Sequence, residues 1–514
     1  MQAADFLAWL VDAPVVRRMD PARLVDYGAR FAEIQADLDR AGDPQTLFRL
    51  AQKMYALGDE TSALTLALHV HARAEAPLRY RAAARAGRCL YELGLTREAR
   101  ELMETALGEL SRSHPDSPLL AVLDNMLGNA CELDGMDVEA EHHYQKTLRT
   151  LRRLSDAHLH AAGFPNRWLL EHPPRMNLCE IAIKRAERLA APAHDRLLEA
   201  VHAQLDEGLA RPEVPTEFLG MYHILRARAL TAGGRFDESA DRLAGLEAPM
   251  RVSPDMHWCL PILLRERGRL HARRGEPAAA YRDLRAAMHE SLSSIAVIEE
   301  RTVVVEIFRV LAGMHGGGER VMMDELGEHG PARGLMDEIL ACLEQKDWYT
   351  GKNHSRAVAR LAERIADRIP ECAELDRRAL TQGALLHDIG KLSIPWSLLN
   401  KCAPLTGWER GYLQGHAEAG ERLLTMVGLT AAARIAGGHH RFYSGGGYPD
   451  TRPVNDAATE IVAVADAFEA MITPTRRYRT AKSVPDAVAE ILRCAPGQFS
   501  PRAAQALAKL YPAA

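Results

Sequence analysis

Side chains that commonly bind metal ions recur in five separate segments of the last third of the 514-residue chain. They fall at the ends or turns of apolar stretches, an unusual place for residues that only decorate a solvated face. The residues are His354 in NHSRAVARLAERIA, His387 and Asp388 in ALLHDIGK, His416 in GHAEAG, His439 and His440 in GGHH, and Asp466 in IVAVADAFEAM. One HD dipeptide alone would be more typical of helix packing, but five segments with the same chemistry predict a metal site.

Imidazole and carboxylate groups together suit Fe, Mn or Zn, and the lack of a thiolate in these segments argues against a structural zinc. Seven ligands are too many for one catalytic metal with an open position, but they suit a pair. Adjacent residues at a helical end point about 100° apart, so His387 can bind one ion while Asp388 bridges two. Metal pairs roughly 3.5–4 Å apart can clamp a phosphate for in-line attack. The expected site is therefore a two-metal centre able to hold a phosphate.

The elements that position these residues are expected to be helices. Ala, Leu, Arg and Glu are abundant and aromatic residues make up only 6% of the chain, which favours helix over strand. With 47% hydrophobic and 26% charged residues the composition is that of a globular protein, and 514 residues predict two or three domains. We therefore expect an all-α protein in which the chain before about Asp337 positions or regulates the metal site.

The net charge indicates which classes of partner to expect, and the cysteine spacing indicates the cellular compartment. A net charge of -5 gives no reason to expect binding to DNA or to a membrane, so an anionic ligand needs a local site. The eight cysteines are spread singly, without a CxxC pair, which favours a reducing compartment. The N-terminus, MQAADFLAWLVDAPVVRR, lacks a basic leader, and no apolar stretch approaches the roughly 20 residues of a membrane span. A cytoplasmic location is therefore expected.

A repeated pattern of small residues runs from about Pro44 to Glu290. Each repeat has a turn glycine: Gly58, Gly94, Gly135, Gly234 and Gly275. Small residues lie seven positions before these glycines, at Ala51, Gly87, Gly128, Ala227 and Gly268, and five positions after them, at Ala63, Ala99, Ala140, Ser239 and Ala280. Further along each repeat, at one fixed distance after its turn glycine, lie Ala67, Met103, Tyr144, Leu243 and Leu284. The pattern predicts antiparallel helix pairs that cross closely at the small residues, with the glycine ending the first helix.

This pattern, clearest in GRCLYELGLTREARELMETAL, resembles the tetratricopeptide repeat. The resemblance implies an α-solenoid within residues 1–290, with an irregular helix pair around Met176–Leu209. Such arrays often bind a peptide or a protein on their concave surface. We expect a polypeptide partner here, which includes self-association into a homodimer. The alternative is a solenoid with no ligand of its own.

The segment 291–330 is predicted to connect the repeats to the C-terminal part. Ser291–Leu311 has apolar residues at near-helical spacing and predicts one long helix, after which GMHGGGERV introduces a glycine cluster. Another helix, Pro331–Gln345, is expected to lead into a domain over residues 331–514. The glycine cluster is either a plain loop or a hinge.

The C-terminal motifs resemble those of the HD phosphohydrolase superfamily, an all-helical fold. LLHDIGKLSIPWSLLNK, LTGWERGYLQGHAEAGERLL and HHRFYSGGGYP are similar to its HD-GYP subfamily, over roughly Asp347–Arg479. The resemblance implies a phosphodiesterase that hydrolyses cyclic di-GMP to pGpG or GMP with two divalent ions, Fe or Mn in preference to Zn. It also implies that the seven residues above are the metal ligands and that Asp388 is catalytic.

The same resemblance implies substrate contacts. Lys391, one turn beyond the HD pair, would act as a catalytic cation on a substrate phosphate, and a cation there suits a ligand with two negative charges. Arg476 and Arg479 in TPTRRYR are candidates for a basic, phosphate-contacting element, with a solvated basic turn as the alternative. Tyr448 is placed with the substrate-binding residues, and its GGYP loop is a candidate contact for a diguanylate cyclase domain.

The chain departs from the subfamily pattern HHExxDGxGYP, with Arg441 in place of the glutamate and Ser444 in place of the aspartate. Losing a carboxylate that orients a metal-bound histidine typically costs about 10- to 100-fold in affinity or activity. Thr350 stands where some members add a glutamate for a third metal, so two metals are expected. The basic segment after Asp466 is one residue longer than the usual pattern.

Two other functions stay open beside the expected enzyme. One is a catalytically weak sensor or scaffold that binds a cyclic dinucleotide and signals through the repeats. The other is an HD hydrolase that acts on another cyclic dinucleotide or nucleotide. The intact set of seven ligands favours the enzyme, because a pure binding module has no chemical need for the whole set.

Overall fold

The protein is helical throughout the part that the structure describes. This structure, a computed structural model, describes residues 42–512 except 57–58, 165, 211–213, 215, 254–255, 295–302, 304–305, 308–332, 348–352, 401–404, 406, 427, 451, 455 and 474–480. Within these residues there is no strand, and a single isolated bridge joins Arg441 to Gly447. The predicted all-α class is confirmed. The described residues fall into two compact units, 42–294 and 303–512.

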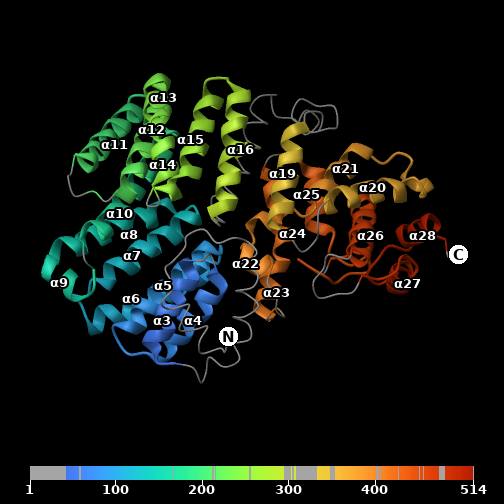
Figure 1. The fold of residues 1–514 in the computed structure, drawn as a ribbon, viewed down its shortest axis with the longest axis horizontal. Helices are drawn as coiled ribbons and strands as arrows, with labels where there is room; N and C mark the ends of the chain where they lie inside the picture. Colours follow the sequence, from blue (N-terminus) through green and yellow to red (C-terminus); the bar gives the residue numbers. More distant parts are fainter. Residues whose placement is uncertain are drawn as a thin grey trace. The chain divides into compact units, whose positions relative to one another are not determined.

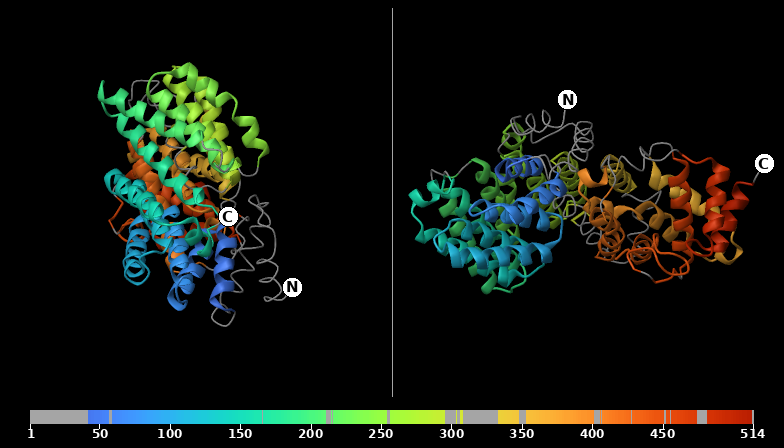
Figure 2. Two further views of the ribbon diagram at one scale, coloured as in Figure 1. Left: turned by 90° about the vertical axis from the view of Figure 1, so that its left-hand side faces the viewer. Right: turned by 90° about the horizontal axis from the view of Figure 1, so that it is seen from below.

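The first unit is an array of antiparallel helix pairs (Figure 1). Successive helices lie side by side and pack on their neighbours along the chain (Figure 2). The elements are α3 (Pro44–Ala56), α4 (Glu60–Arg73), α5 (Leu78–Glu92), α6 (Thr96–Ser113), α7 (Leu119–Leu133), α8 (Asp137–Arg153), α9 (Asp156–Ala161), α10 (Trp168–Ala186), α11 (Ala193–Leu209), α12 (Thr216–Ala232), α13 (Phe236–Ala244), α14 (Glu247–Val252), η2 (His257–Cys259), α15 (Leu260–Arg273) and α16 (Pro277–Ser294).

The repeat pattern is confirmed in its turns and its crossings. The turn glycines Gly94, Gly135, Gly234 and Gly275 have φ values of 81°, 73°, 73° and 73°, a left-handed conformation that costs glycine little. Gly58 lies outside the described residues. The small residues five positions after the glycines are fully buried, as are Ala51 and Ala227 before them. The irregular pair expected around Met176–Leu209 is α10 with α11.

Gly128 shows why a small residue is required at a helix crossing. A Cβ atom there would lie 2.4 Å from the Tyr144 ring of the next helix. This ring cannot easily move, because Tyr144 is fully buried and its hydroxyl lies 2.9 Å from each of two acceptors, Asn129 Oδ1 and Glu132 Oε2.

Replacing Gly128 by alanine is therefore expected to lower the free energy of unfolding by about 1–3 kcal/mol, through overpacking. Gly108, on α6, is the matched control because an added Cβ there would meet only the end of the Arg112 side chain, at 4.0 Å. Gly108→Ala should stabilise by about 0.5–1 kcal/mol, since alanine favours helix. Urea unfolding followed by circular dichroism measures both. Equal effects of the two variants would contradict the close crossing.

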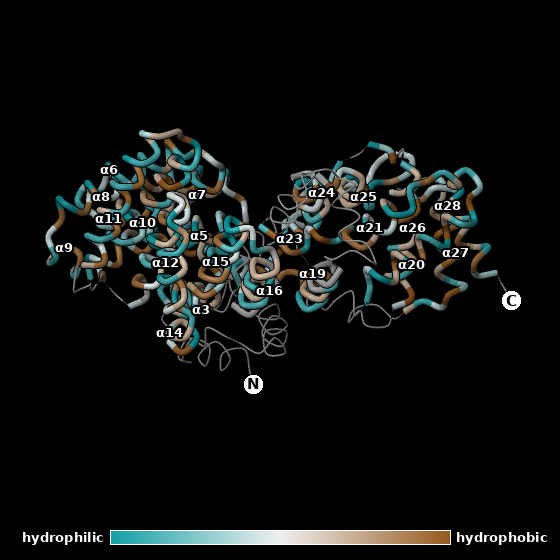
Figure 3. Tube along the Cα trace, turned by 90° about the horizontal axis from the view of Figure 1, so that it is seen from above, coloured by the Kyte–Doolittle hydropathy of each residue, from teal (hydrophilic) through white to brown (hydrophobic). Residues whose placement is uncertain are grey.

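The second unit places several short helices around one hydrophobic core. Its elements are α19 (Arg333–Lys346), α20 (His354–Ala366), η3 (Pro370–Cys372), α21 (Arg377–Leu386), η4 (Ile389–Ser393), α22 (Trp396–Leu399), α23 (Gly407–Gln414), α24 (His416–Met426), α25 (Thr430–Gly438), α26 (Ala457–Ile472), α27 (Val484–Cys494) and α28 (Pro501–Leu510). The largest core cluster draws on α20, α21, α26, α27 and α28, together with Ile435 of α25. Hydrophobic and hydrophilic stretches alternate along these helices (Figure 3), as expected when one face of each is buried.

The connector between the units lies mostly outside the described residues. Of the predicted helix Ser291–Leu311, only the end of α16 and the helical residues Val303, Glu306 and Ile307 are described. The glycine cluster is not described, so the boundaries 1–290, 291–330 and 331–514 stay a prediction. Among the described helices, none combines the length and the apolar character needed to cross a bilayer.

Candidate metal centre

The predicted ligands lie mainly at the ends of helices in the second unit. His354 begins α20 and His416 begins α24. His387 directly follows α21, and His439 directly follows α25. Asp466 is the exception, because it lies within α26. Helix ends let short segments from different helices converge, and the structure brings all seven predicted ligands together.

Hydrogen bonds orient four of the imidazole rings. The Nδ1 atoms of His387, His416 and His439 lie 2.7, 2.7 and 2.8 Å from backbone carbonyls three residues earlier in the chain. A carbonyl oxygen only accepts, so each Nδ1 must carry the proton. The Nδ1 atom of His354 lies 2.5 Å from Glu469 Oε2. In each ring the other nitrogen, Nε2, is thereby left for another partner.

These four Nε2 atoms are buried and make no hydrogen bond of good geometry, although carboxylate oxygens of Asp388 or Asp466 lie 3.2–3.9 Å from them. The rings belong to His354, His387, His416 and His439, none more than 3% exposed. A buried polar atom without a partner is costly in a folded protein, and four pointing into one site call for an explanation. A metal ion bound to Nε2 satisfies each of them, so the residues present fit a metal centre.

The ligand atoms form two clusters that share Asp388. In the first, His354 Nε2 lies 3.2 Å and His387 Nε2 3.8 Å from Asp466 Oδ1. The second is His416, His439 and His440, whose ligand atoms lie within 4.8 Å of one another.

Asp388 turns one carboxylate oxygen toward each cluster. Its Oδ2 lies 3.3 Å from His387 Nε2 and 3.8 Å from His354 Nε2. Its Oδ1 lies 3.4 Å from His416 Nε2 and 3.9 Å from His439 Nε2. A carboxylate between two sets of imidazoles has the geometry needed to bridge two cations.

The protonation states suit cations in both clusters. Burial raises the pKa of Asp388, but the charges of Lys391 and His387 outweigh burial and hold it well below its usual range. Burial likewise opposes ionisation of Asp466, whose pKa is nevertheless lowered by its contact with His354. Both carboxylates are therefore negatively charged.

The histidines of the two clusters differ in their pKa values. Burial lowers the pKa of His439 to about 3, and burial also lowers the pKa values of His416 and His440. These three rings are neutral and can donate a lone pair. Burial would lower the pKa of His354 too, but the carboxylates of Asp466 and Glu469 raise it to about 10. This cluster attracts positive charge, either as a proton or as a metal ion.

Lys391 lies at the edge of the centre, held by two carboxylates. Its Nζ atom donates to Asp388 Oδ2 at 2.6 Å and to Asp347 Oδ2 at 2.7 Å. Burial opposes its charge, but these two carboxylates raise its pKa above the ordinary value. The ammonium is therefore charged and fixed beside the shared carboxylate.

Two functional residues escaped the sequence analysis. Glu469 orients His354, and its position three residues after Asp466 puts both carboxylates on one face of α26, a signal that could have found it. Asp347 holds Lys391 from 44 residues away in the sequence, and no local pattern predicts such a pair.

In the loop after His440, both residues at which the sequence differs from the pattern HHExxDGxGYP make hydrogen bonds. Arg441, which replaces a glutamate, donates to Asp450 Oδ2 at 2.7 Å. Ser444, which replaces an aspartate, donates to the carbonyl of Gly497 at 2.9 Å and so ties the loop to the turn after α27. Tyr448 packs over the His440 ring, with ring centres 4.5 Å apart. Four ring orientations thus depend on backbone carbonyls and Glu469, and neither substituted position supplies them.

Some predicted residues lie outside the described part. Arg476, Arg479 and Thr350 are among them, so their roles stay predictions.

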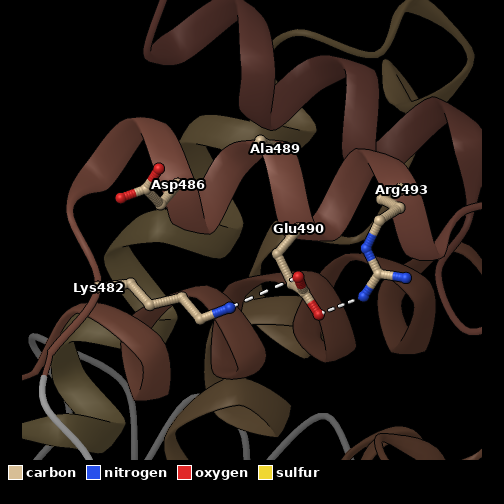
Figure 4. A pocket seen from close by; sticks show the side chains of 5 residues that line it. All are labelled: Lys482, Asp486, Ala489, Glu490 and Arg493. Atoms are coloured by element: carbon tan, nitrogen blue, oxygen red, sulfur yellow. Dashed lines mark hydrogen bonds and ion pairs between the residues drawn. The ribbon is translucent and has the colours of Figure 1, made fainter.

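A surface depression of about 420 Å³ on the same unit is lined by Lys482, Asp486, Ala489, Glu490 and Arg493 (Figure 4). It contains none of the seven predicted ligands, and its Lys482 and Arg493 both pair with Glu490.

Gly390 permits the close approach of two ligand-bearing elements. An added Cβ would lie 1.9 Å from the carbonyl oxygen of His416 and 2.6 Å from the backbone nitrogen of Gly420. Backbone atoms cannot yield as a flexible side chain can, so η4 and α24 would have to move apart.

Gly390→Ala is accordingly expected to destabilise the fold by about 3 kcal/mol or more and to weaken metal binding. Gly420→Ala is the milder control, since its Cβ would come no nearer than 3.3 Å to another atom. Metal content after gel filtration and thermal melting test this expectation. A Gly390→Ala protein with normal metal content and melting would refute it.

Comparison with protein families places an HD domain in this unit. Residues 340–501 match the family model described as HD domain. The chain is 34% identical over 211 residues to a 3'3'-cGAMP-specific phosphodiesterase of Vibrio cholerae, covering 38% of this chain and 44% of the relative. It is 35% identical over 179 residues to a cyclic di-GMP phosphodiesterase of Thermotoga maritima, covering 34% of this chain and 48% of the relative. The chain thus spans about half the length of the curated relatives it matches.

A solved structure of a tetratricopeptide repeat protein from Parabacteroides merdae is similar to 54% of this chain and 95% of its own. The TM-score is 0.32 at 15% identity, too low to carry an argument. The description of the array therefore rests on its own crossings and turns.

Proposed function

We propose that the HD domain is a metal-dependent phosphodiesterase that hydrolyses cyclic di-GMP to pGpG or GMP. The observation that carries the proposal is the shared carboxylate of Asp388, which faces two clusters of unpartnered imidazole nitrogens. The similarity to a 3'3'-cGAMP-specific phosphodiesterase and a cyclic di-GMP phosphodiesterase supports the substrate class.

The seven ligands divide between two metal positions in this proposal. His354, His387 and Asp466 would hold one ion, and His416, His439 and His440 the other, with Asp388 between them. Nitrogen and carboxylate ligands without thiolate suit Fe or Mn, with Zn as the alternative. When bound, a metal pair supplies an activated water and the positive charge that stabilises in-line attack on phosphorus.

The chain's own residues would then bind and orient the substrate. Lys391 places a fixed positive charge beside Asp388, where a substrate phosphate oxygen could meet it. Tyr448 would contribute an aromatic ring next to His440 for contact with the substrate. Arg476 and Arg479 would contribute further phosphate contacts.

A second substrate is favoured by the relatives themselves. One of them is named for specificity toward 3'3'-cGAMP, so a mixed cyclic dinucleotide is the second candidate. Both dinucleotides carry two phosphodiester groups, and the metal centre by itself does not distinguish them.

The array is proposed to regulate or target this activity through a polypeptide partner. A diguanylate cyclase domain, another protein or a second copy of the chain would fit this role. We also propose a cytoplasmic location and the predicted division at residues 290 and 330.

The deciding experiment is hydrolysis of cyclic di-GMP and 3'3'-cGAMP by the metal-loaded full chain, with products separated by chromatography. Linear pGpG or GMP is expected from cyclic di-GMP. Cleavage of 3'3'-cGAMP alone would select the second substrate. If the chain holds two ions and binds either dinucleotide but cleaves neither, the domain is a sensor or scaffold and not an enzyme.

A further inference from the structure

We infer that α19 is a positioning element for the metal centre, and that its displacement would empty one metal position before the other. This inference rests on the metal pair of the proposed function. Its basis is that α19 contacts both η4, which follows Asp388, and α20, which begins with His354.

The end of α19 is held to η4 by two hydrogen bonds and to Asn400, which follows α22, by a third. Lys346 is 1% exposed, and its Nζ atom donates to the carbonyl of Leu392 at 2.7 Å. Asn400 Nδ2 donates to the carbonyl of Lys346 at 2.7 Å. Asp347, 2% exposed, accepts the Lys391 hydrogen bond at 2.7 Å. Buried polar contacts of this kind have little freedom to rearrange, so η4 follows the end of α19.

The same helix also holds the start of α20. Arg356 donates to Asp337 Oδ1 at 2.8 Å, and the backbone N–H of Asn353 donates to Glu344 Oε1 at 2.9 Å. Asn353 has a positive φ of 65°, an uncommon conformation for a residue other than glycine. His354 comes next in the chain, so these contacts control where its ring enters the site.

The elements that α19 holds supply one ligand of the first cluster, His354, and the shared Asp388, while His387 and Asp466 come from the end of α21 and from α26. His354 and Asp388 Oδ2 lie on that side, whereas His416, His439 and His440 come from α24 and the end of α25. Asp388 reaches both clusters, and α19 reaches His416 through η4, which packs on α24, whereas it holds the helix that begins with His354 directly. A shift of α19 should therefore weaken the first position more than the second.

Lys391 links the end of α19 to the shared carboxylate of Asp388 by its charge as well as by packing. Its ammonium lies between the carboxylates of Asp347 and Asp388. Without the Asp347 charge, the ammonium would pair with Asp388 Oδ2 alone and compete with a metal ion for that oxygen. Asp347 thus keeps the shared carboxylate available, and it acts through Lys391 as a positioning residue.

The test is metal binding by the full-length Asp347→Asn variant, measured by elemental analysis after dialysis and by Mn²⁺ titration. One ion per chain should remain where the wild type holds two, with the affinity of the lost position lowered about 10- to 100-fold. Asp337→Asn should have a smaller effect, at most about fivefold, because its ion pair with Arg356 is half-exposed.

Glu490→Gln is the matched control. Glu490 also accepts from a cationic side chain, Arg493 Nη2 at 2.6 Å, on the same unit but in the depression without ligands (Figure 4). It should keep both ions at wild-type affinity. A second control is His354→Ala, which should lose the same ion, so that Asp347→Asn in that background changes metal content no further.

Two retained ions in Asp347→Asn would overturn the inference. Loss of both ions would also overturn it, whether or not the helical circular dichroism signal falls. A wild-type chain that binds two ions but cleaves no cyclic dinucleotide would overturn the proposed reaction while leaving this inference testable by metal count. A wild-type chain that binds no metal would overturn both.

Discussion

Asp388→Ala is expected to abolish hydrolysis of a cyclic dinucleotide, with a loss of at least about 1,000-fold in kcat. The physical reason is the position of its two oxygens, 3.3 Å from His387 Nε2 on one side and 3.4 Å from His416 Nε2 on the other. Metal ions contribute several kcal/mol to such reactions, and each 1.36 kcal/mol is a factor of ten in rate.

Metal content should fall together with the rate, from two ions to at most one. The variant also leaves the Lys391 ammonium paired with Asp347 alone, so stability must be measured beside activity. Glu490→Ala controls for the loss of a carboxylate elsewhere on the unit and should keep full activity. Activity of Asp388→Ala within tenfold of the wild type, at equal protein concentration, would rule out the shared-carboxylate centre.

Removal of metal by a chelator should have the second largest effect, with complete loss of turnover and a lower melting temperature. The four buried Nε2 atoms lose their partners when the ions leave, which is costly inside the protein. A ligand present at about 100 times its Kd stabilises a fold by about 2.7 kcal/mol, and this contribution disappears on chelation.

Adding metal ions back to the chelated protein distinguishes an enzyme from a sensor. Fe²⁺ or Mn²⁺ should restore both turnover and melting temperature, and Zn²⁺ should restore melting at least in part. If Mn²⁺ restores melting but no cyclic dinucleotide is cleaved, the domain is a sensor in which the metals support only binding. An untreated chain whose melting is unaffected by chelator would contradict the metal centre itself.

Much of the array could be predicted from the sequence because its signals are local. A glycine that ends one helix and small residues at fixed offsets on either side set the turn and the crossing point. The large residues further along then pack against the small ones, as Tyr144 does against Gly128. Most of the long helix expected over Ser291–Leu311, and the arginines of TPTRRYR, lie outside the described residues.

For the metal centre, the candidate ligands could be predicted from the sequence alone, since histidines and aspartates recur at the ends of helical segments. The sequence did not show how they are oriented or shared. The Glu469 bond to His354 joins residues 115 apart, and the Asp347 bond to Lys391 joins residues 44 apart. The opposite directions of the two Asp388 oxygens likewise depend on four helices meeting.

Only tertiary packing decides such contacts, because hydrogen bonds and ion pairs act over a few ångströms while sequence patterns describe only neighbours along the chain. The sequence thus determined the helical class, the repeat and the list of candidate ligands. The tertiary structure decided that Asp388 lies between two clusters, that three rings are oriented by backbone carbonyls, and that α19 holds two of the elements carrying ligands.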